Sequence, residues 1–335
     1  MRLNTRQLLE AGYFGNSDAV VQIRELQSDP HSGSGGKGYT FSLLGGLSFE
    51  VLPDRGLDIG AAWFDGLPIA WRSPIGSPDL APSPSYWLGR FGGGLLVTCG
   101  ADNIGAPRDG YGQHGSHHDT RSYDVCIQRI QGPNAPGVRI TGVIDSVEIF
   151  GRRVRIYRSI VSYADDPVIS ISDEVTNHGP GSSQVALLYH FNFGAPLVLP
   201  GTTVSMSATV HEIKEITEAG DSWKVFPSPT DTLCEAVWQH EGFDTDEHGY
   251  CCVQVVSPVG VVAQLSWNAA QLPKLVQWIF PSRNSWALGI EPSTSPIFGA
   301  EYDAVNAGRR LLHPGQSFRS ELILRLGNAA KSEGN

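Results

Sequence analysis

The sequence predicts an all-β protein built as one large antiparallel β-sandwich. Alternating apolar and polar residues recur along most of the chain, and a period of two residues is typical of a half-buried strand. Helical periodicity is nearly absent outside the N-terminus. Glycine (39) and proline (22) are spread through the 335 residues, as expected for many short strands joined by turns.

The elements follow in order from these patterns. Residues 4–13, NTRQLLEAGY, are the one fair helix candidate, with Asn4 as a capping residue. Two strand regions come next, 39–53 and 58–73, and Asp65-Gly66 is a natural hairpin turn within the second. Further strands are expected at 95–99, 122–130, 137–149, 152–162, 167–176, 184–193, 203–215, 250–257, 260–267, 275–280, 285–291 and 316–326.

No linker in the sequence is long enough to separate domains. We therefore expect a single domain over residues 1–335, with 1–34 as an N-terminal extension and 328–335 as a flexible tail. The proline-rich stretch 73–87 is the longest irregular segment, and we expect it to form a surface loop near the functional site.

Charge and cysteine content narrow the partners and the compartment. The net charge of −10 disfavours nucleic acids and anionic membranes, because no basic field is present to attract phosphate. The start of the chain lacks an apolar signal core, and no run of about 18 apolar residues occurs. Five cysteines form no CxxC pair, and an odd number argues against a disulfide framework. We expect a soluble, reduced, cytoplasmic protein.

The segment LLYHFNFG, residues 187–194, places two polar side chains in an apolar aromatic run. In a strand, Tyr189, Phe191 and Phe193 share one face, whereas His190 and Asn192 share the other with Leu188. One face is typical of a buried core. A histidine in such a place is more often structural than catalytic, so both interpretations stand for His190 at this point.

A second unusual strand is WALGIE, residues 286–291. Its pattern sends Trp286, Leu288 and Ile290 to one side and Ala287, Gly289 and Glu291 to the other. A carboxylate beside two very small side chains has open space in front of it. Such space suits a ligand and has no use in a packed core.

Three histidines lie in the glycine-rich segment GYGQHGSHHD, residues 110–119. His114, His117, His118 and Asp119 are close enough in sequence to suggest metal ligands, but no other histidine or cysteine pair has ligand spacing. A loop with one functional histidine is the favoured interpretation, and we expect no metal. GRFGGG, residues 89–94, lacks the spacing of a nucleotide-binding loop and is typical of a tight turn.

Three motifs in this order, HG at 114–115, YHFNFG at 189–194 and GIEPSTSP at 289–296, resemble the galactose mutarotase (aldose 1-epimerase) superfamily. The segments FEVLPDRGLDIGAAWFDGLPIAWRSP and GGGLLVTCGADN look closer to its DUF4432 branch. The resemblance covers roughly residues 35–325. It implies a twisted antiparallel β-supersandwich with a sugar cleft on its concave face.

The resemblance also implies roles for individual residues. Glu291 matches the general base, His190 the general acid and His114 the loop histidine that contacts the sugar. The family's sugar-binding arginine and aspartate have no clear match in this sequence. The residues expected to bind substrate are Arg72, Asn192, Trp278 and Asn103, with Arg55 and Arg90 as other candidates for the arginine.

Anomer exchange opens a hemiacetal ring and recloses it on the other face of C1. A base takes the proton of the anomeric hydroxyl while an acid protonates the ring oxygen, and we expect Glu291 and His190 on opposite sides of one sugar. No cofactor is required. The sequence thus predicts an aldose 1-epimerase-like isomerase acting on a free sugar or sugar acid. The alternative is a protein that binds or senses a carbohydrate without turnover, and a homodimer is an assembly that the sequence leaves open.

Overall fold

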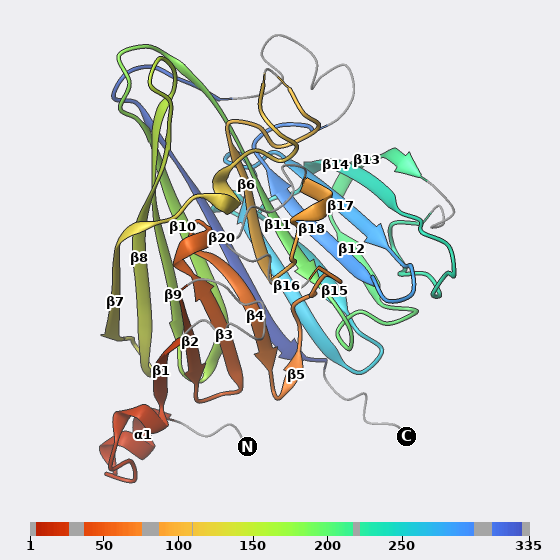
Figure 1. The fold of residues 1–335 in the computed structure, drawn as a ribbon. Helices are drawn as coiled ribbons and strands as arrows, with labels where there is room; N and C mark the ends of the chain where they lie inside the picture. The colour runs from red at the N-terminus through yellow and green to blue at the C-terminus, as the bar shows by residue number, and fades with distance from the viewer. Residues whose placement is uncertain are drawn as a thin grey trace.

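A computed structural model of the chain describes residues 5–26, 37–75, 87–108, 110–216, 222–297 and 310–329. In this part of the chain 56% of the residues lie in strands and 6% in helices, so the predicted all-β class is confirmed. Two large antiparallel sheets make up the molecule (Figure 1). The predicted helix is present as α1 (Thr5–Glu10), whereas Asn4 lies outside the described residues.

The larger sheet has twelve strands. Its hydrogen-bonded order is β1 (Val21–Leu26), β2 (Gly38–Leu43), β3 (Leu47–Leu52), β4 (Asp58–Phe64), β6 (Leu96–Ala101), β11 (Ser183–Phe193), β18 (Ala287–Ser293), β17 (Lys274–Phe280), β14 (Ala236–Phe243) and β13 (Ala208–Ile216), with β5 (Leu67–Pro68) on β4 and β19 (Arg310–Leu312) on β11.

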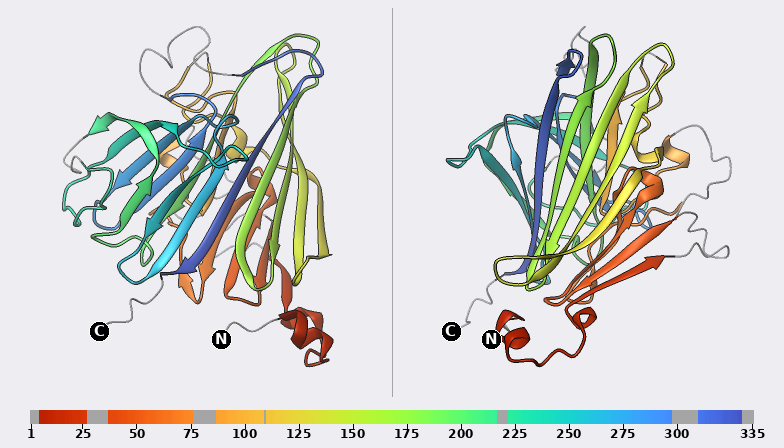
Figure 2. Two further views of the ribbon diagram at one scale, coloured as in Figure 1. Left: turned by 180° about the vertical axis from the view of Figure 1, so that it is seen from behind. Right: turned by 90° about the vertical axis from the view of Figure 1, so that its left-hand side faces the viewer.

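The smaller sheet has eight strands, several of which run side by side along one face of the molecule (Figure 2). Its order is β12 (Thr203–Met206), β15 (Tyr250–Val256), β16 (Val261–Asn268), β20 (Ser317–Asn328), β10 (Asp166–Asn177), β9 (Arg153–Tyr163), β8 (Pro136–Val147) and β7 (Tyr123–Gln131).

Most predicted strands are present within a few residues of their expected bounds. The region 39–53 is divided into β2 and β3, because Gly45 and Gly46 adopt positive φ angles and turn the chain. Strands β1, β14 and β19 were not predicted. β1 lies within the predicted N-terminal extension and is an edge strand of the larger sheet. Most of the expected 73–87 loop (residues 76–86) and tail residues 330–335 lie outside the described ranges.

Turn chemistry agrees with two sequence predictions. Asp65 and Gly66 both have positive φ (50° and 80°) and join β4 to β5, as the hairpin prediction requires. In GRFGGG, a Cβ on Gly93 would lie 2.7 Å from the carbonyl oxygen of Trp71, and one on Gly94 would lie 2.9 Å from that of Ile59. Close backbone packing therefore explains these glycines.

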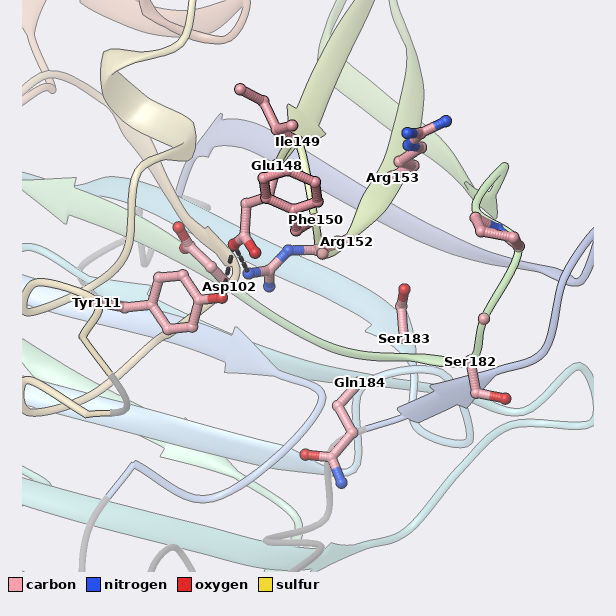
Figure 3. Close-up of a pocket in the computed structure, with 13 residues that line it drawn as sticks. Asp102, Tyr111, Glu148, Ile149, Phe150, Arg152, Arg153, Ser182, Ser183 and Gln184 are labelled. Atoms are coloured by element: carbon pink, nitrogen blue, oxygen red, sulfur yellow. Dashed lines mark hydrogen bonds and ion pairs between the residues drawn. The ribbon is translucent and has the colours of Figure 1, made fainter.

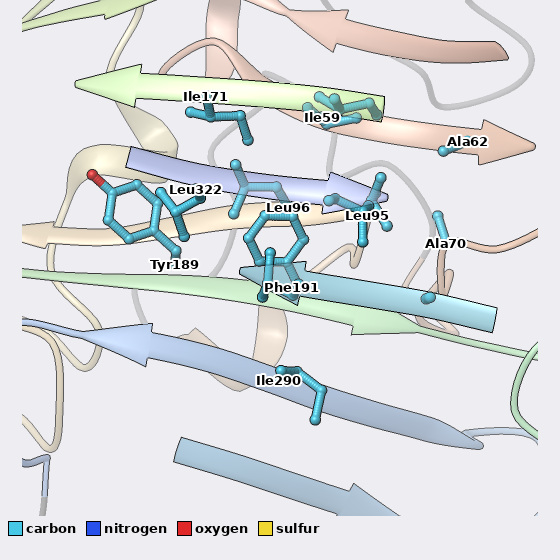
Figure 4. Packing of buried hydrophobic residues seen from close by; sticks show 14 of the residues in the cluster. Ile59, Ala62, Ala70, Leu95, Leu96, Ile171, Tyr189, Phe191, Ile290 and Leu322 are labelled. Carbon is cyan, nitrogen blue, oxygen red and sulfur yellow. The ribbon is translucent and has the colours of Figure 1, made fainter. Parts of the chain in front are cut away.

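The core lies between the two sheets. From β11 of the larger sheet it takes Tyr189, Phe191 and Phe193, all buried, as the strand pattern predicted. Figure 4 shows Tyr189 and Phe191 packed with Ile171 of β10 and Leu322 of β20, which belong to the smaller sheet. Apolar burial between the layers is the main stabilising contribution.

One ionic network crosses this core. The Arg158 guanidinium is fully buried and contacts Asp58 (2.8 Å) and Asp173 (2.7 Å). Asp58 also accepts hydrogen bonds from the backbone and hydroxyl of Thr98, and the Tyr189 hydroxyl donates to Asp173. Because each buried charge is paired and hydrogen-bonded, the network ties the sheets together beneath the strand that carries His190.

Helices are short in the ranges that the structure describes, and none of them is both long and apolar enough to cross a membrane. All five cysteines are free.

Candidate functional site

The register between β11 and β18 brings His190 and Glu291 together, although 101 positions separate them in the sequence. On β11 and β18, Phe191 pairs with Ile290 and Asn192 with Gly289, which sets His190 beside Glu291. The Nε2 atom of His190 lies 3.2 Å from Oε1 of Glu291. Both side chains point away from the core, as the alternation predicted, and both are buried.

Gly289 makes this approach possible. A Cβ at this position would lie 2.3 Å from Oε1 of Glu291, 3.0 Å from Cβ of Trp278 and 3.2 Å from Cε1 of His190. Glycine leaves this volume open at the meeting point of three site residues. The small residue beside the carboxylate thus provides space for the site, as the sequence indicated.

The two side chains line one cavity of about 160 Å³ on the outer face of the larger sheet. Its wall is partly aromatic: Trp87 stacks on Phe91 with ring centroids 4.5 Å apart, and Trp278 meets the His190 ring edge-on at 5.8 Å. The described lining residues are Trp87, Leu88, Phe91, Gln113, His114, His190, Glu235, Val237, Val276, Trp278, Glu291 and Ile297.

The geometry corrects one expectation about the acid/base pair. His190 and Glu291 do not face each other across a sugar-sized gap but lie in contact on one wall. Their contact is not aligned as a hydrogen bond, and within the described residues Glu291 Oε1 and His190 Nδ1 have no hydrogen-bond partner. Buried polar atoms are almost always satisfied in folded proteins, so these two are candidates for ligand contacts.

Burial disfavours the charged form of both groups. It raises the pKa of Glu291 well above its usual value, and the nearby Glu235 carboxylate raises that pKa further. Burial lowers the pKa of His190 well below its usual value, and the neighbouring His114 has the same effect. A neutral imidazole beside a carboxylic acid holds the same number of protons as an imidazolium beside a carboxylate. Transfer of this proton from one group to the other therefore leaves the net charge of the cavity unchanged.

His114 enters the cavity from the 102–116 loop in a left-handed backbone conformation (φ 60°). Its Nδ1 lies 2.8 Å from the carbonyl oxygen of Ile104. Because a carbonyl only accepts, Nδ1 carries the proton. Burial lowers the pKa of His114 to about 4, so the ring is neutral at pH 7 and its Nε2 is a hydrogen-bond acceptor. His114 Nε2 can therefore accept a hydrogen bond from a sugar hydroxyl. It cannot bond to the ring oxygen, which has no proton to donate.

Buried side chains fix the 102–116 loop. Asn103 donates through Nδ2 to the carbonyls of Gly105, Ala106 and Gly112, and Asp102 accepts from the backbone and hydroxyl of Ser116. Asn103, which the sequence proposed as a substrate contact, therefore supports the loop and does not line the cavity.

The other two histidines of this segment have separate partners. His117 contacts the carbonyl of Gly56, and His118 lies 3.3 Å from Asp119, which also pairs with Arg90. Among the described residues, no group of three or more histidine, cysteine, aspartate or glutamate side chains is arranged to hold a metal ion.

Trp278 lines the cavity, and it positions a carboxylate that the sequence did not indicate. Its Nε1 donates to Oε2 of Glu235 at 2.7 Å. Glu235 lies just before β14, a strand that was not predicted. A signal was present in CEAVWQHE, because Glu235 and Val237 share one strand face, and both line the cavity.

Two further predicted contacts lie elsewhere. Arg72 is exposed and pairs through its backbone with Gly93, outside the described cavity lining. Asn192 is buried beside the site, where its Nδ2 donates to the carbonyls of Gly94 and His190. The described lining thus contains two carboxylates and no lysine or arginine.

Comparison with known proteins agrees with this architecture. The profile of the DUF4432 family, a domain of unknown function, matches residues 33–326. No curated protein matches the chain.

Solved structures share the fold at low sequence identity. A Klebsiella pneumoniae protein provisionally named an aldose 1-epimerase has a TM-score of 0.80 and 23% identity over 92% of this chain and 83% of its own. A galactose mutarotase-like protein from Clostridium acetobutylicum has a TM-score of 0.62 and 15% identity, covering 92% and 99%. A galactose mutarotase related enzyme from Lactobacillus acidophilus has a TM-score of 0.59 and 14% identity, covering 88% and 98%. The chain is therefore a member of the DUF4432 family and has the galactose mutarotase-like fold.

Proposed function

We propose that the protein is an isomerase that interconverts the anomers of a free aldose by general acid/base ring opening. One observation carries the proposal. His190 and Glu291 touch inside an aromatic-lined cavity and leave buried polar atoms without partners in the described structure. The names of the structural neighbours support the same class of reaction.

In the proposed reaction, the proton that the pair shares first moves from Glu291 to His190; Glu291 then takes the proton of the anomeric hydroxyl while His190 protonates the ring oxygen. The bond between C1 and the ring oxygen breaks, and the aldehyde forms. Rotation about the C1–C2 bond presents the other carbonyl face, and the two proton transfers then run in reverse. No net proton is gained or lost, which matches a pair that holds a single proton.

Contact between the two groups is compatible with this chemistry. The anomeric oxygen and the ring oxygen are bonded to the same carbon, so a proton donor and an acceptor that are neighbours can reach both. His114, with Nε2 as acceptor, would hold a hydroxyl of the sugar. Trp87, Phe91 and Trp278 offer apolar faces for the C–H surface of the ring.

We further propose a neutral aldose as substrate in preference to a sugar acid. Glu235 and Glu291 line the cavity, and no cation is found among its described lining residues. A uronate carboxylate would meet two like charges or acidic groups there, at a cost in binding free energy. A cytoplasmic location is also proposed, supported by five free cysteines.

The test is exchange NMR or polarimetry on a panel of neutral aldoses and uronates. We expect wild-type protein to accelerate anomer exchange of a neutral aldose, and Glu291→Gln and His190→Ala each to reduce the catalysed rate by about 10²-fold or more. The exposed Glu174→Gln and His248→Ala are matched controls and should keep full activity. If Glu291→Gln kept a large part of the wild-type activity, Glu291 would not be the general base.

A carbohydrate-binding protein without turnover is the second candidate. It is favoured by the aromatic wall, which provides sugar affinity without acid/base chemistry. Thermal-shift screening with the same sugars separates the two functions. Binding of a sugar whose exchange rate stays at the uncatalysed value would establish the second candidate for that sugar.

A further inference from the structure

An apolar knob protrudes where the smaller sheet ends. β8 ends at Val147 and β9 begins at Arg153, and the hairpin tip between them carries Ile149 and Phe150. Phe150 is fully exposed and Ile149 is 81% exposed, with Val147 also exposed. Single exposed apolar residues are normal, but three within four positions at a projecting tip indicate a surface made for contact.

A hollow of about 620 Å³ lies directly beside this knob (Figure 3). Its walls come from three places: the hairpin tip itself, the 102–116 loop and the β10–β11 turn. The lining residues are Asp102, Tyr111, Glu148, Ile149, Phe150, Gly151, Arg152, Arg153, Pro180, Gly181, Ser182, Ser183 and Gln184. Leu311, also exposed, pairs with Gln184 across strands β19 and β11 and adds an apolar residue beside the rim.

The hollow is held open by contacts within its wall. Glu148 Oε1 accepts from the Tyr111 hydroxyl at 2.6 Å and from Arg152 Nη2 at 2.9 Å (Figure 3). The Arg152 guanidinium lies 4.8 Å from the centre of the Tyr111 ring. The Arg152 side chain is only 8% exposed, and its Nε has no hydrogen-bond partner in the described structure. Because these contacts fix the wall in advance, a group that binds in the hollow loses little free energy to ordering of the wall.

Knob and hollow belong to one patch, and this patch carries both signs of charge. Its exposed charges are the Glu148 carboxylate, whose side chain is 41% exposed, and the Arg153 guanidinium group; Asp102 and Arg152 are largely buried in the wall. A two-fold symmetric interface requires a surface that is complementary to itself, with each protrusion matched by a recess and each charge by its opposite. An anionic or a cationic partner would fit only half of these charges.

We propose that the β8–β9 hairpin tip and the adjoining hollow form a homodimer interface. The Ile149-Phe150 tip of each copy enters the hollow of the other, where the Tyr111 ring and the Arg152 guanidinium receive an aromatic side chain. Arg153 of each copy, at the exposed edge, faces the exposed Glu148 carboxylate of its partner. The interface also covers Asp102 and Tyr111, which belong to the loop that carries His114.

The test is sedimentation velocity of the full-length protein from about 1 to about 100 μM, a range that brackets micromolar dissociation constants. We expect wild-type protein to dimerise and Phe150→Asp to weaken the dimer at least about tenfold, as loss of an aromatic anchor does. Val259→Asp is the matched control, because Val259 is an exposed residue at the turn between β15 and β16. It should dimerise as wild type does.

Phe150 makes no buried contact, so its replacement should leave the far-UV circular dichroism spectrum and the melting temperature unchanged. The proposal is overturned by wild-type protein that stays monomeric across the concentration range, or by a dimer that persists unchanged in Phe150→Asp. Amide hydrogen exchange provides a second measurement. Exchange in residues 145–153 and 178–184 should become slower as the concentration of the wild-type protein rises, and it should not change with the concentration of Phe150→Asp.

Discussion

At the scale of single residues, the site depends on Gly289, because glycine has no Cβ atom. Gly289 has an ordinary strand conformation, so its value lies in space and not in backbone freedom. The volume of one methyl group there decides whether an imidazole and a carboxyl group can meet.

Gly289→Ala should therefore disable the site while the sheets still form. Its Cβ would fall 2.3 Å from Oε1 of Glu291. We expect a loss of about 10²-fold in the anomer-exchange rate and a cost of about 1–3 kcal/mol in the free energy of unfolding, measured by exchange NMR and urea denaturation. Gly327→Ala in β20 is the control, because a Cβ there meets nothing within 4 Å. Equal rates for the two variants would show that the space at Gly289 does not matter.

At the scale of elements, the 102–116 loop is positioned by one amide side chain. Asn103 satisfies three loop carbonyls, and His114 follows the last of them by two residues. Alanine at this position leaves those carbonyls without their donor.

Asn103→Ala should lower the turnover rate by about 10²-fold, since small misplacements of a positioned group have effects of this size. The free energy of unfolding should fall by about 1–3 kcal/mol because buried carbonyls lose their donor, while the far-UV circular dichroism spectrum should show that the sheets still form. Asn268→Ala removes comparable turn contacts far from the cavity and should keep normal kinetics. Unchanged kinetics in Asn103→Ala would mean that His114 needs no such support.

Local alternation explains which elements the sequence reveals. β11 and β18 have one apolar face in the core and one face at the site, so the period of two was clear and placed His190, Gly289 and Glu291 correctly. β14 is covered on both faces: Gln239 and His240 are consecutive and both buried. Its polar and apolar residues do not alternate, and the strand was missed together with Glu235.

Register between distant strands is a tertiary property that no local pattern contains. The sequence could indicate that His190 and Glu291 leave their strands on the site face. That they touch on one wall follows from the pairing of β11 with β18. Arg72 illustrates the same limit: residues near it in sequence, such as Trp71, pack on the cavity's aromatic wall, whereas Arg72 itself is exposed.

At the scale of the whole molecule, buried neutral histidines link stability to pH. Burial lowers the pKa of His114 to about 4 and those of His117 and His240 to about 3, and it lowers that of His190 as well. In the unfolded chain histidine titrates near 6.5. Because the unfolded state binds these protons first, stability present above pH 6.5 is lost as the pH falls toward 4.

We therefore expect the urea midpoint to fall steadily between pH 7 and pH 4.5. His117→Gln should reduce this slope, since the amide can still donate to the Gly56 carbonyl and has no proton to gain. His248→Gln, at an exposed position, should leave the slope unchanged. A midpoint that does not vary over this range would contradict the neutral burial of these histidines.

The most direct test of the account is the catalysed anomer-exchange rate of four proteins: wild type, His190→Ala, Glu291→Gln and the double variant. If the two residues act as one proton-handling unit, each single change removes about 10²-fold or more of the catalysed rate and the double change removes scarcely more. Independent, additive losses, or a catalysed rate that survives in the double variant, would contradict the account.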